Sequence, residues 1–297
     1  MMTNGSSMNM IRHYIVAPFI VSLVLLIVGM FLFKNTGVNN LEIIKKNDFP
    51  LNTLYSHRGL NSINNVIGNL EGENSIPSFE LAGKNGYKYL ETDIHETKDG
   101  KFFCIHDNTT ISYSRFDFVV TNSLSQDILN VKLNKIIKND RVSKEFQEKV
   151  YNIPLLEDYL AICKKYNMVP LIEIKQLQNN TVSVDNLIKA VKKYTDKFII
   201  FSFNLSYVLR AKRYDGNIPV LYLTPEDNEI TKDVVDLYAS FGIGIAPPLN
   251  KVSKDVCEYS FNKGYPMVIW SVDDKNQYLN EYIYWKVWMF GTNSIVL

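Results

Sequence analysis

The sequence predicts an α/β protein whose main body is a (β/α)8 TIM-type barrel, with a small insertion after strand two and one transmembrane helix before the barrel. Short apolar runs alternate with helix-like stretches from residue 51 onwards, the pattern of a parallel sheet covered by helices. Eight such runs within about 250 residues match the size of this barrel. A separate apolar stretch near the N-terminus lies outside that alternation and is long enough to cross a bilayer.

The first element is the apolar stretch 14–33, which comes after a short tail at 1–13. At 1.5 Å per residue it reaches about 30 Å, the thickness of the hydrocarbon core of a bilayer. A cleavable signal peptide is the alternative, but this stretch is longer than a usual signal core. Residues 31–34 (Phe-Leu-Phe-Lys) also offer no small-residue cleavage site. We therefore expect an uncleaved transmembrane helix, with a polar linker after it at 34–50.

The barrel is expected over residues 51–297. Its strands are expected at 53–57, 88–93, 169–174, 198–202, 219–223, 243–246, 267–271 and 294–297. Its helices are expected at 76–85, 156–167, 184–194, 205–213, 229–240, 251–263 and 275–284. Residues 107–155 interrupt the alternation after strand two and are expected to form the insertion. Because active sites of such barrels lie at the C-terminal ends of the strands, polar side chains there are the first candidates for chemistry.

Composition excludes some classes of protein. The formal net charge of +1 gives no basic field, so a nucleic-acid partner is not expected. The three cysteines are widely and irregularly spaced, which is neither a disulfide framework nor a zinc-binding pattern. Cys104 lies in an apolar run and is expected to be a core thiol.

The second strand carries two carboxylates one residue apart, Glu91 and Asp93. Residues i and i+2 of a strand point to the same face, so the two acids converge. The turn at 98–101 (Lys-Asp-Gly-Lys) predicts a hairpin whose return strand brings His106 back beside them. Paired acids beside an imidazole favour a metal-assisted hydrolase over a solvated surface.

Further motifs occur in a fixed order along the chain, namely His57-Arg58-Gly59, Glu73-Asn74-Ser75, Glu91-x-Asp93 with its hairpin to His106-Asp107, and Glu173-Ile174-Lys175. This ordered set resembles the glycerophosphodiester phosphodiesterase family, over roughly residues 53 to 297. The resemblance implies a phosphoric diester hydrolase that releases glycerol 3-phosphate and an alcohol from a glycerophosphodiester substrate. One departure concerns the C-terminus, where the family segment ending in Thr-Asp is replaced by 291–297 (Gly-Thr-Asn-Ser-Ile-Val-Leu). We therefore expect a short last strand and incomplete closure of the barrel there.

Three acids, Glu91, Asp93 and Glu173, form an oxygen-rich set that suits one hard divalent cation, Mg²⁺ or Ca²⁺. Zinc is disfavoured because no cysteine or histidine-rich spacing accompanies them. The resemblance assigns metal ligation to the same three positions.

The resemblance also implies that His57 and His106 are the catalytic acid–base pair. Imidazoles exchange protons near neutrality, so one would start neutral as the base and the other protonated as the acid. A third histidine, His95, is expected to have a structural role.

The remaining site residues are cations and possible substrate contacts. Arg58 and Lys175 can supply positive charge to the substrate phosphate. The resemblance makes Glu73 and Asn74 possible contacts to the metal or to glycerol, while Ser75 keeps the hydroxyl needed for a helix N-cap. Trp270 could offer an apolar wall to the glycerol carbons.

Two other functions stay open: a phospholipase-type enzyme that acts on intact membrane lipids, and a non-catalytic barrel that binds polyglycerol phosphate or lipid headgroups. The presence of both histidines, both cations and all three acids disfavours the non-catalytic barrel.

Positive charges flank the apolar stretch on both sides and are nearly balanced, with Arg12 before it and Lys34, Lys45 and Lys46 after it. Because an uncleaved signal anchor usually exports the domain on its C-terminal side, we expect a single-pass membrane protein with an extracytoplasmic catalytic domain.

Overall fold

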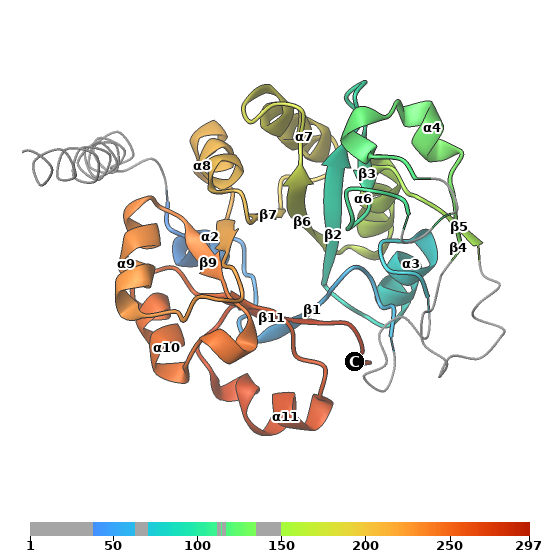
Figure 1. The fold of residues 1–297 in the computed structure, drawn as a ribbon. Coiled ribbons are helices and arrows are strands. Elements are labelled where there is room, and N and C mark those ends of the chain that lie inside the picture. The colour runs from blue at the N-terminus through green and yellow to red at the C-terminus, as the bar shows by residue number, and fades with distance from the viewer. Residues whose placement is uncertain (1–37, 63–70, 112–113, 115–116, 135–149) are drawn as a thin grey trace, which may run out of the picture.

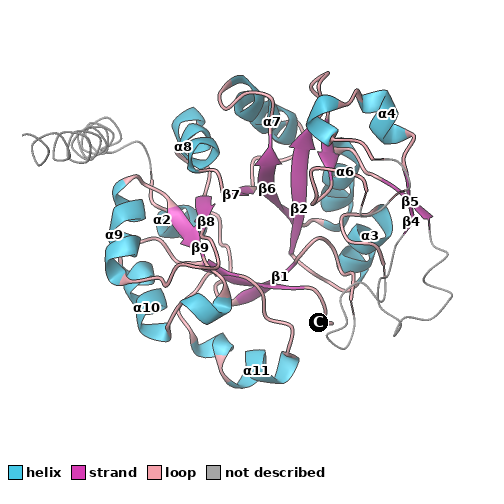
Figure 2. Cartoon of the chain, viewed as in Figure 1, coloured by secondary structure: helices cyan, strands magenta, loops and turns pink. Residues whose placement is uncertain are grey.

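The structure, a computed structural model, describes residues 38–62, 71–111, 114, 117–134 and 150–297. Within these ranges, parallel strands form a nearly closed barrel with helices around it (Figure 1 and Figure 2). The barrel strands are β1 (Thr53–Ser56), β2 (Tyr89–Glu96), β6 (Val169–Gln176), β7 (Ile199–Ser202), β8 (Val220–Leu223), β9 (Gly244–Ala246), β10 (Val268–Ile269) and β11 (Met289–Thr292). The predicted eight-stranded barrel is thus confirmed.

Neighbouring strands of the barrel are not all paired to the same extent. The strands pair in parallel in the order β10-β11-β1-β2-β6-β7-β8-β9. The remaining join, between β9 and β10, is one parallel bridge from Pro248 to Trp270 just beyond the ends of these strands. The barrel is therefore nearly closed, and its weakest seam lies between β9 and β10.

The last strand was predicted at the wrong residues. Strand β11 is Met289–Thr292 and not 294–297, and it pairs with both β10 and β1. The apolar residues just before and within it are fully buried, whereas the chain end at Leu297 is 57% exposed. Burial between two strands decides the assignment, and because β11 pairs on both sides, the expected incomplete closure at the last strand is wrong.

The outer layer follows the predicted helices closely. The helices after the barrel strands are α3 (Ile76–Lys84), α6 (Leu156–Tyr166), α7 (Val182–Lys192), α8 (Leu205–Tyr214), α9 (Lys232–Ser240), α10 (Lys254–Asn262) and α11 (Lys275–Asn280). Short 3-10 turns come after β9 and α11, at η2 (Leu249–Lys251) and η3 (Tyr282–Tyr284). Ser75 caps α3 by accepting a hydrogen bond from the backbone N–H of Ser78, as its hydroxyl predicted.

Part of the expected linker 34–50 is a helix. Residues Asn40–Lys46 form α2, in which Ile43 and Ile44 are buried. Ile44 packs with Tyr55 and Trp288 in the apolar cluster that fills the barrel interior. The polar composition of 34–50 concealed this helix because only three of its residues are buried.

The chain between β2 and α6 adds a small unit beside the barrel. Strand β3 (Phe102–Cys104) returns antiparallel along β2, as the hairpin signal predicted. The next elements are η1 (Val120–Asn122), α4 (Ser125–Leu129) and the antiparallel pair β4 (Lys132–Asn134) and β5 (Val150–Asn152). These elements enclose their own apolar cluster, formed by Phe103, Ile105, Val120, Ile128, Val131 and Ile153.

The predicted membrane helix cannot be compared with the structure, because residues 14–33 lie outside the described ranges. Within those ranges we find no helix with the length and apolar character needed to cross a bilayer.

Candidate active site

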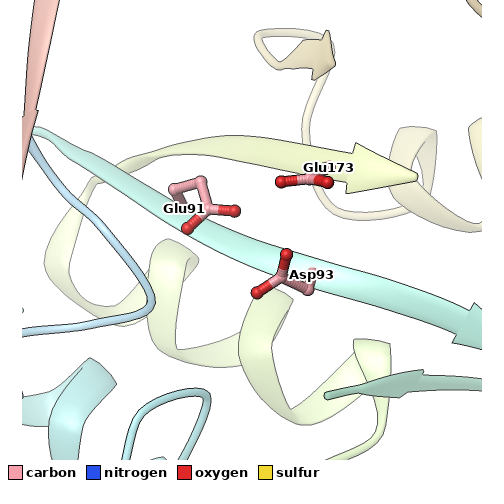
Figure 3. A group of neighbouring side chains, drawn as sticks. All are labelled: Glu91, Asp93 and Glu173. Carbon is pink, nitrogen blue, oxygen red and sulfur yellow. The ribbon is translucent and has the colours of Figure 1, made fainter. Parts of the chain in front are cut away.

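Three buried carboxylates meet inside the barrel. Glu91 and Asp93 are alternate residues of β2, and Asp93 is the register partner of Glu173 on β6. One carboxylate oxygen from each residue lies within 4.8 Å of the others (Figure 3). The side chains are nearly inaccessible, with residue exposures of 2%, 0% and 7%. Alternation along the strands and register between them thus bring the three predicted acids together.

Arg58 binds this cluster from the loop after β1. Its backbone N–H donates to Glu91 Oε2 at 2.8 Å, and its Nε lies 3.1 Å from Asp93 Oδ2. This geometry needs a left-handed turn, with φ of 55° at Arg58 and 81° at Gly59. A Cβ at Gly59 would lie 2.3 Å from Ser78 Oγ, so only glycine fits there. The backbone conformation of this turn therefore requires part of the His-Arg-Gly motif, in addition to the chemistry of its side chains.

Asn74 contacts the cluster directly, whereas Glu73 acts on it through Arg58. Asn74 Nδ2 donates to Asp93 Oδ2 at 2.8 Å, and Asn74 Oδ1 accepts from Thr92 Oγ1 at 2.7 Å. Glu73 Oε2 lies 3.1 Å from Arg58 Nη1. The structure therefore places Asn74 against Asp93 and Glu73 against the guanidinium of Arg58.

Lys175 supplies a second cation from the end of β6. Its Nζ lies 2.8 Å from Glu173 Oε1 and 3.7 Å from Asp93 Oδ1. The ammonium also lies 5.7 Å from the ring centroid of Phe203, the residue after β7. Phe203 is 42% exposed and packs edge-on against Trp270 at 6.2 Å. Trp270 is held by a hydrogen bond of 2.9 Å from its Nε1 to the Ala246 carbonyl, so two aromatic rings border the mouth next to Lys175.

His57 is oriented by two residues that sequence reasoning missed. Its Nδ1 lies 2.8 Å from Asn293 Oδ1. Asn293 Nδ2 donates to Asp273 Oδ2 at 3.1 Å, which fixes the amide with its oxygen towards His57. Nδ1 of His57 must therefore carry the proton, and Nε2 keeps the lone pair. The missed signal was Thr292-Asn293 at the true end of β11, where the family ends its last strand with Thr-Asp.

Burial and the neighbouring Arg58 lower the pKa of His57 to about 4. The ring is therefore neutral near pH 7. Combined with the hydrogen bond from Nδ1 to Asn293, this makes Nε2 a proton acceptor at neutral pH.

His106 lies at the end of the hairpin beyond β3. Its Nδ1 lies 2.8 Å from Asp107 Oδ1, which orients the ring and leaves Nε2 for proton exchange. His95 Nε2 donates to the backbone carbonyl of His106 at 3.1 Å. His95 thus holds the loop that carries His106, in keeping with the expected structural role.

When no cation is present, the negative charges of the three buried acids repel one another and shift their pKa values. Burial, followed by the Asp93 carboxylate, raises the pKa of Glu173 to about 7, and burial with both neighbouring acids raises that of Glu91. Burial would also raise the pKa of Asp93, but Arg58, His106 and Lys175 outweigh it and lower that pKa. Glu91 Oε1 and Asp93 Oδ1 are buried without a hydrogen-bond partner. Buried carboxylate oxygens that face one another without a hydrogen-bond donor suit a hard divalent cation, so the three acids fit one.

The sequence is similar to those of known proteins. Residues 57–290 match the sequence profile of the glycerophosphoryl diester phosphodiesterase family. An uncharacterised protein of Mycoplasma genitalium is 24% identical over 233 residues, which are 76% of this chain and 88% of that protein. The human lysophospholipase D GDPD1 is 28% identical over 153 residues, half of this chain and 47% of that protein.

Solved structures share the fold. A phosphodiesterase of Oleispira antarctica in complex with the product sn-glycerol-3-phosphate superposes with a TM-score of 0.67 at 17% identity, covering 84% of this chain and 94% of that chain. A glycerophosphodiester phosphodiesterase of Parabacteroides distasonis superposes with a TM-score of 0.64 at 21% identity, covering 81% and 92%.

Proposed function

Because the chain belongs to the glycerophosphoryl diester phosphodiesterase family, it is a phosphoric diester hydrolase, and we propose that it cleaves glycerophosphodiesters into glycerol 3-phosphate and an alcohol. The observation that carries this proposal is the convergence of three buried acids with Arg58 and Lys175 at the barrel mouth. A phosphodiester is an anion that resists attack by water, so its hydrolysis needs positive charge on the phosphoryl oxygens and groups that move protons.

Positive charge on the phosphate would come from three sources. Glu91, Asp93 and Glu173 would hold one Mg²⁺ or Ca²⁺, which supplies Lewis-acid stabilisation of the phosphoryl oxygens when bound. Arg58 and Lys175 already lie against these acids and would bind the remaining phosphoryl oxygens.

Proton transfer falls to the two histidines. His57 Nε2 carries a lone pair and accepts the proton of the attacking water as the new P–O bond forms. His106, oriented by Asp107, gives a proton to the alcohol oxygen as the old P–O bond breaks. Phe203 and Trp270 form the apolar wall beside Lys175 on which the glycerol carbons would pack.

A product assay tests the activity. The purified full-length protein, supplied with Mg²⁺ or Ca²⁺, is expected to release glycerol 3-phosphate from glycerophosphocholine, glycerophosphoethanolamine or glycerophosphoinositol. Enzymatic detection of glycerol 3-phosphate separates this reaction from one that leaves phosphate on the other alcohol. Release of phosphocholine in place of glycerol 3-phosphate would overturn the assignment of the cleaved bond.

The proposal includes attachment to a membrane through residues 14–33, whose length and apolar composition fit a single spanning helix. It places the barrel on the outer side, since uncleaved signal anchors usually export the domain on their C-terminal side. Protease added to intact cells or spheroplasts is expected to digest the barrel. Protection of the barrel until the membrane is permeabilised would place it in the cytoplasm instead.

A further inference from the structure

The described chain enters the barrel at the end opposite the active site. Helix α2 binds there through backbone and side-chain contacts: Leu41 N–H donates to the Gly264 carbonyl at 2.8 Å, and Asn40 Nδ2 donates to the Val220 carbonyl at 3.2 Å. Gly264 lies in the turn from α10 to β10, and Val220 is the first residue of β8. Both partners therefore mark the end of the barrel at which the strands begin, which we call the base.

The position of α2 on the base is set by close contacts. A Cβ at Gly264, where φ is +88°, would lie 2.7 Å from the side chain of Asn39, the N-cap of α2. Lys212 on α8 is buried and donates from Nζ to the Val38 carbonyl at 2.8 Å. The chain therefore leaves the base at Val38 in a fixed position.

The catalytic groups lie at the other end. His57 comes directly after the last residue of β1, and Glu173 and Lys175 lie in the C-terminal half of β6. Asn293 comes directly after the last residue of β11. The mouth and the point of attachment of α2 are thus separated by the length of the barrel strands.

The linker to the apolar stretch is short. Residues 34–37 separate the end of 14–33 from Val38. The five Cα–Cα steps from residue 33 to Val38 reach at most about 18 Å. If residues 14–33 span a bilayer, the base must lie next to its surface.

The charge of the base fits such a surface. Exposed lysines lie on α2 and in the turns that lead into the strands, at Lys45, Lys46, Lys84, Lys88, Lys193 and Lys197. The exposed acids on these same segments are Glu42, Asp48 and Asp196. The loop after β8, on the mouth side, carries exposed Glu226, Asp227 and Glu229. The six exposed lysines at the base outnumber the three exposed acids there and would be attracted to an anionic leaflet.

We propose that the barrel stands with its base on an anionic bilayer and its mouth turned towards water, so that its substrate is a water-soluble glycerophosphodiester and not a lipid of the same membrane. This rests on the proposed membrane attachment and phosphodiesterase activity. A lipid held in that bilayer cannot reach the acids and histidines at the far end of the barrel without leaving the membrane.

Site-specific quenching tests the orientation in the full-length protein, inserted into vesicles of phosphatidylcholine and phosphatidylglycerol. Cys104, Cys163 and Cys257 are all buried, so an engineered exposed cysteine can be labelled selectively. Lys197→Cys places a fluorophore on the base and Glu226→Cys places one at the mouth. A nitroxide on the lipid headgroup is expected to quench the base label strongly and the mouth label weakly. Equal quenching, stronger quenching at the mouth, or no quenching of either label would overturn the proposal.

A kinetic comparison in the same vesicles tests the substrate class. Glycerophosphocholine in the aqueous phase is expected to be hydrolysed at least 10-fold faster than lysophosphatidylcholine in the bilayer at equal total concentration. Comparable rates would overturn the proposal even if the proposed activity holds. Loss of activity on glycerophosphocholine would count against the proposed function, while the quenching pattern would still report the orientation.

Discussion

The variant His57→Ala is expected to lower kcat on a glycerophosphodiester by at least roughly 10²-fold, and His106→Ala by a similar factor. General acid–base catalysis contributes typically about 10²- to 10⁴-fold, and each variant removes one of the two proposed proton-transfer groups. For His57 the expectation is specific, because Asn293 accepts from Nδ1 and leaves Nε2 as the proton acceptor. Initial rates at saturating substrate, with melting temperatures to verify folding, measure the effect.

Two controls separate chemistry from structure. Added imidazole is expected to restore part of the activity of His57→Ala, because a free base can enter the space that the ring leaves. Asn293→Leu removes the acceptor for Nδ1 but keeps the ring, so it is expected to lower kcat by less than His57→Ala does. It should also lower the melting temperature, because an unsatisfied buried donor costs about 1–3 kcal/mol of stability. Asn293→Asp keeps an acceptor oxygen and should lose less. A folded His57→Ala or His106→Ala variant with near wild-type kcat would show that this histidine does not transfer a proton in the rate-determining step.

The pH dependence of the wild-type enzyme is set in part by the pKa of His57. Burial and Arg58 lower that pKa to about 4, and a bound cation would lower it further. Because the neutral ring is the active form of a base, His57 stays active as the pH falls well below 6.5.

The convergence of Glu91 and Asp93 was predictable from strand geometry, and the other motif residues were predictable from their resemblance to the family. Glu91 and Asp93 share one face of β2 by alternation, and the parallel register pairs Asp93 with Glu173. The alternation requires only a strand at 88–93, whereas the pairing of Asp93 with Glu173 also requires that the strands at 88–93 and 169–174 lie side by side in register.

The residues that escaped prediction depend on contacts between distant parts of the chain. Asn293 orients His57 only because Thr292 ends β11, and the sequence-based prediction placed this strand five residues too late, at 294–297. Helix α2 has few buried residues, and Ile44 is buried only because the base of the barrel lies behind it. Local composition reveals neither fact.

Removal of one carboxylate of the proposed cation site should have the largest effect. Glu173→Gln is expected to lower kcat/KM by at least about 10³-fold, since Lewis-acid stabilisation contributes several kcal/mol and each 1.4 kcal/mol is about tenfold. Mg²⁺ or Ca²⁺ is expected to raise the melting temperature of the wild type, and the same variant should lose this rise. Glu226→Gln, on an exposed loop beyond β8, is the matched control and should change neither quantity. Full wild-type activity in excess EDTA would contradict the role of a cation.

The rise in melting temperature expected from a cation should also depend on pH, and the pKa values of the buried acids determine the direction. The pKa of Glu173 is raised from 4.5 to about 7 by burial and by Asp93, and the pKa of Glu91 is raised as well. The stability that protonated Glu173 contributes is therefore fully present below about pH 4.5 and is lost as the pH rises through 7. A cation takes over the charge neutralisation that the proton supplied, and it competes with that proton. We expect the cation to raise the melting temperature more at pH 8 than at pH 5.5, measured by calorimetry with and without EDTA. An equal rise at both values, or a larger one at pH 5.5, would show that the cation binds away from these acids.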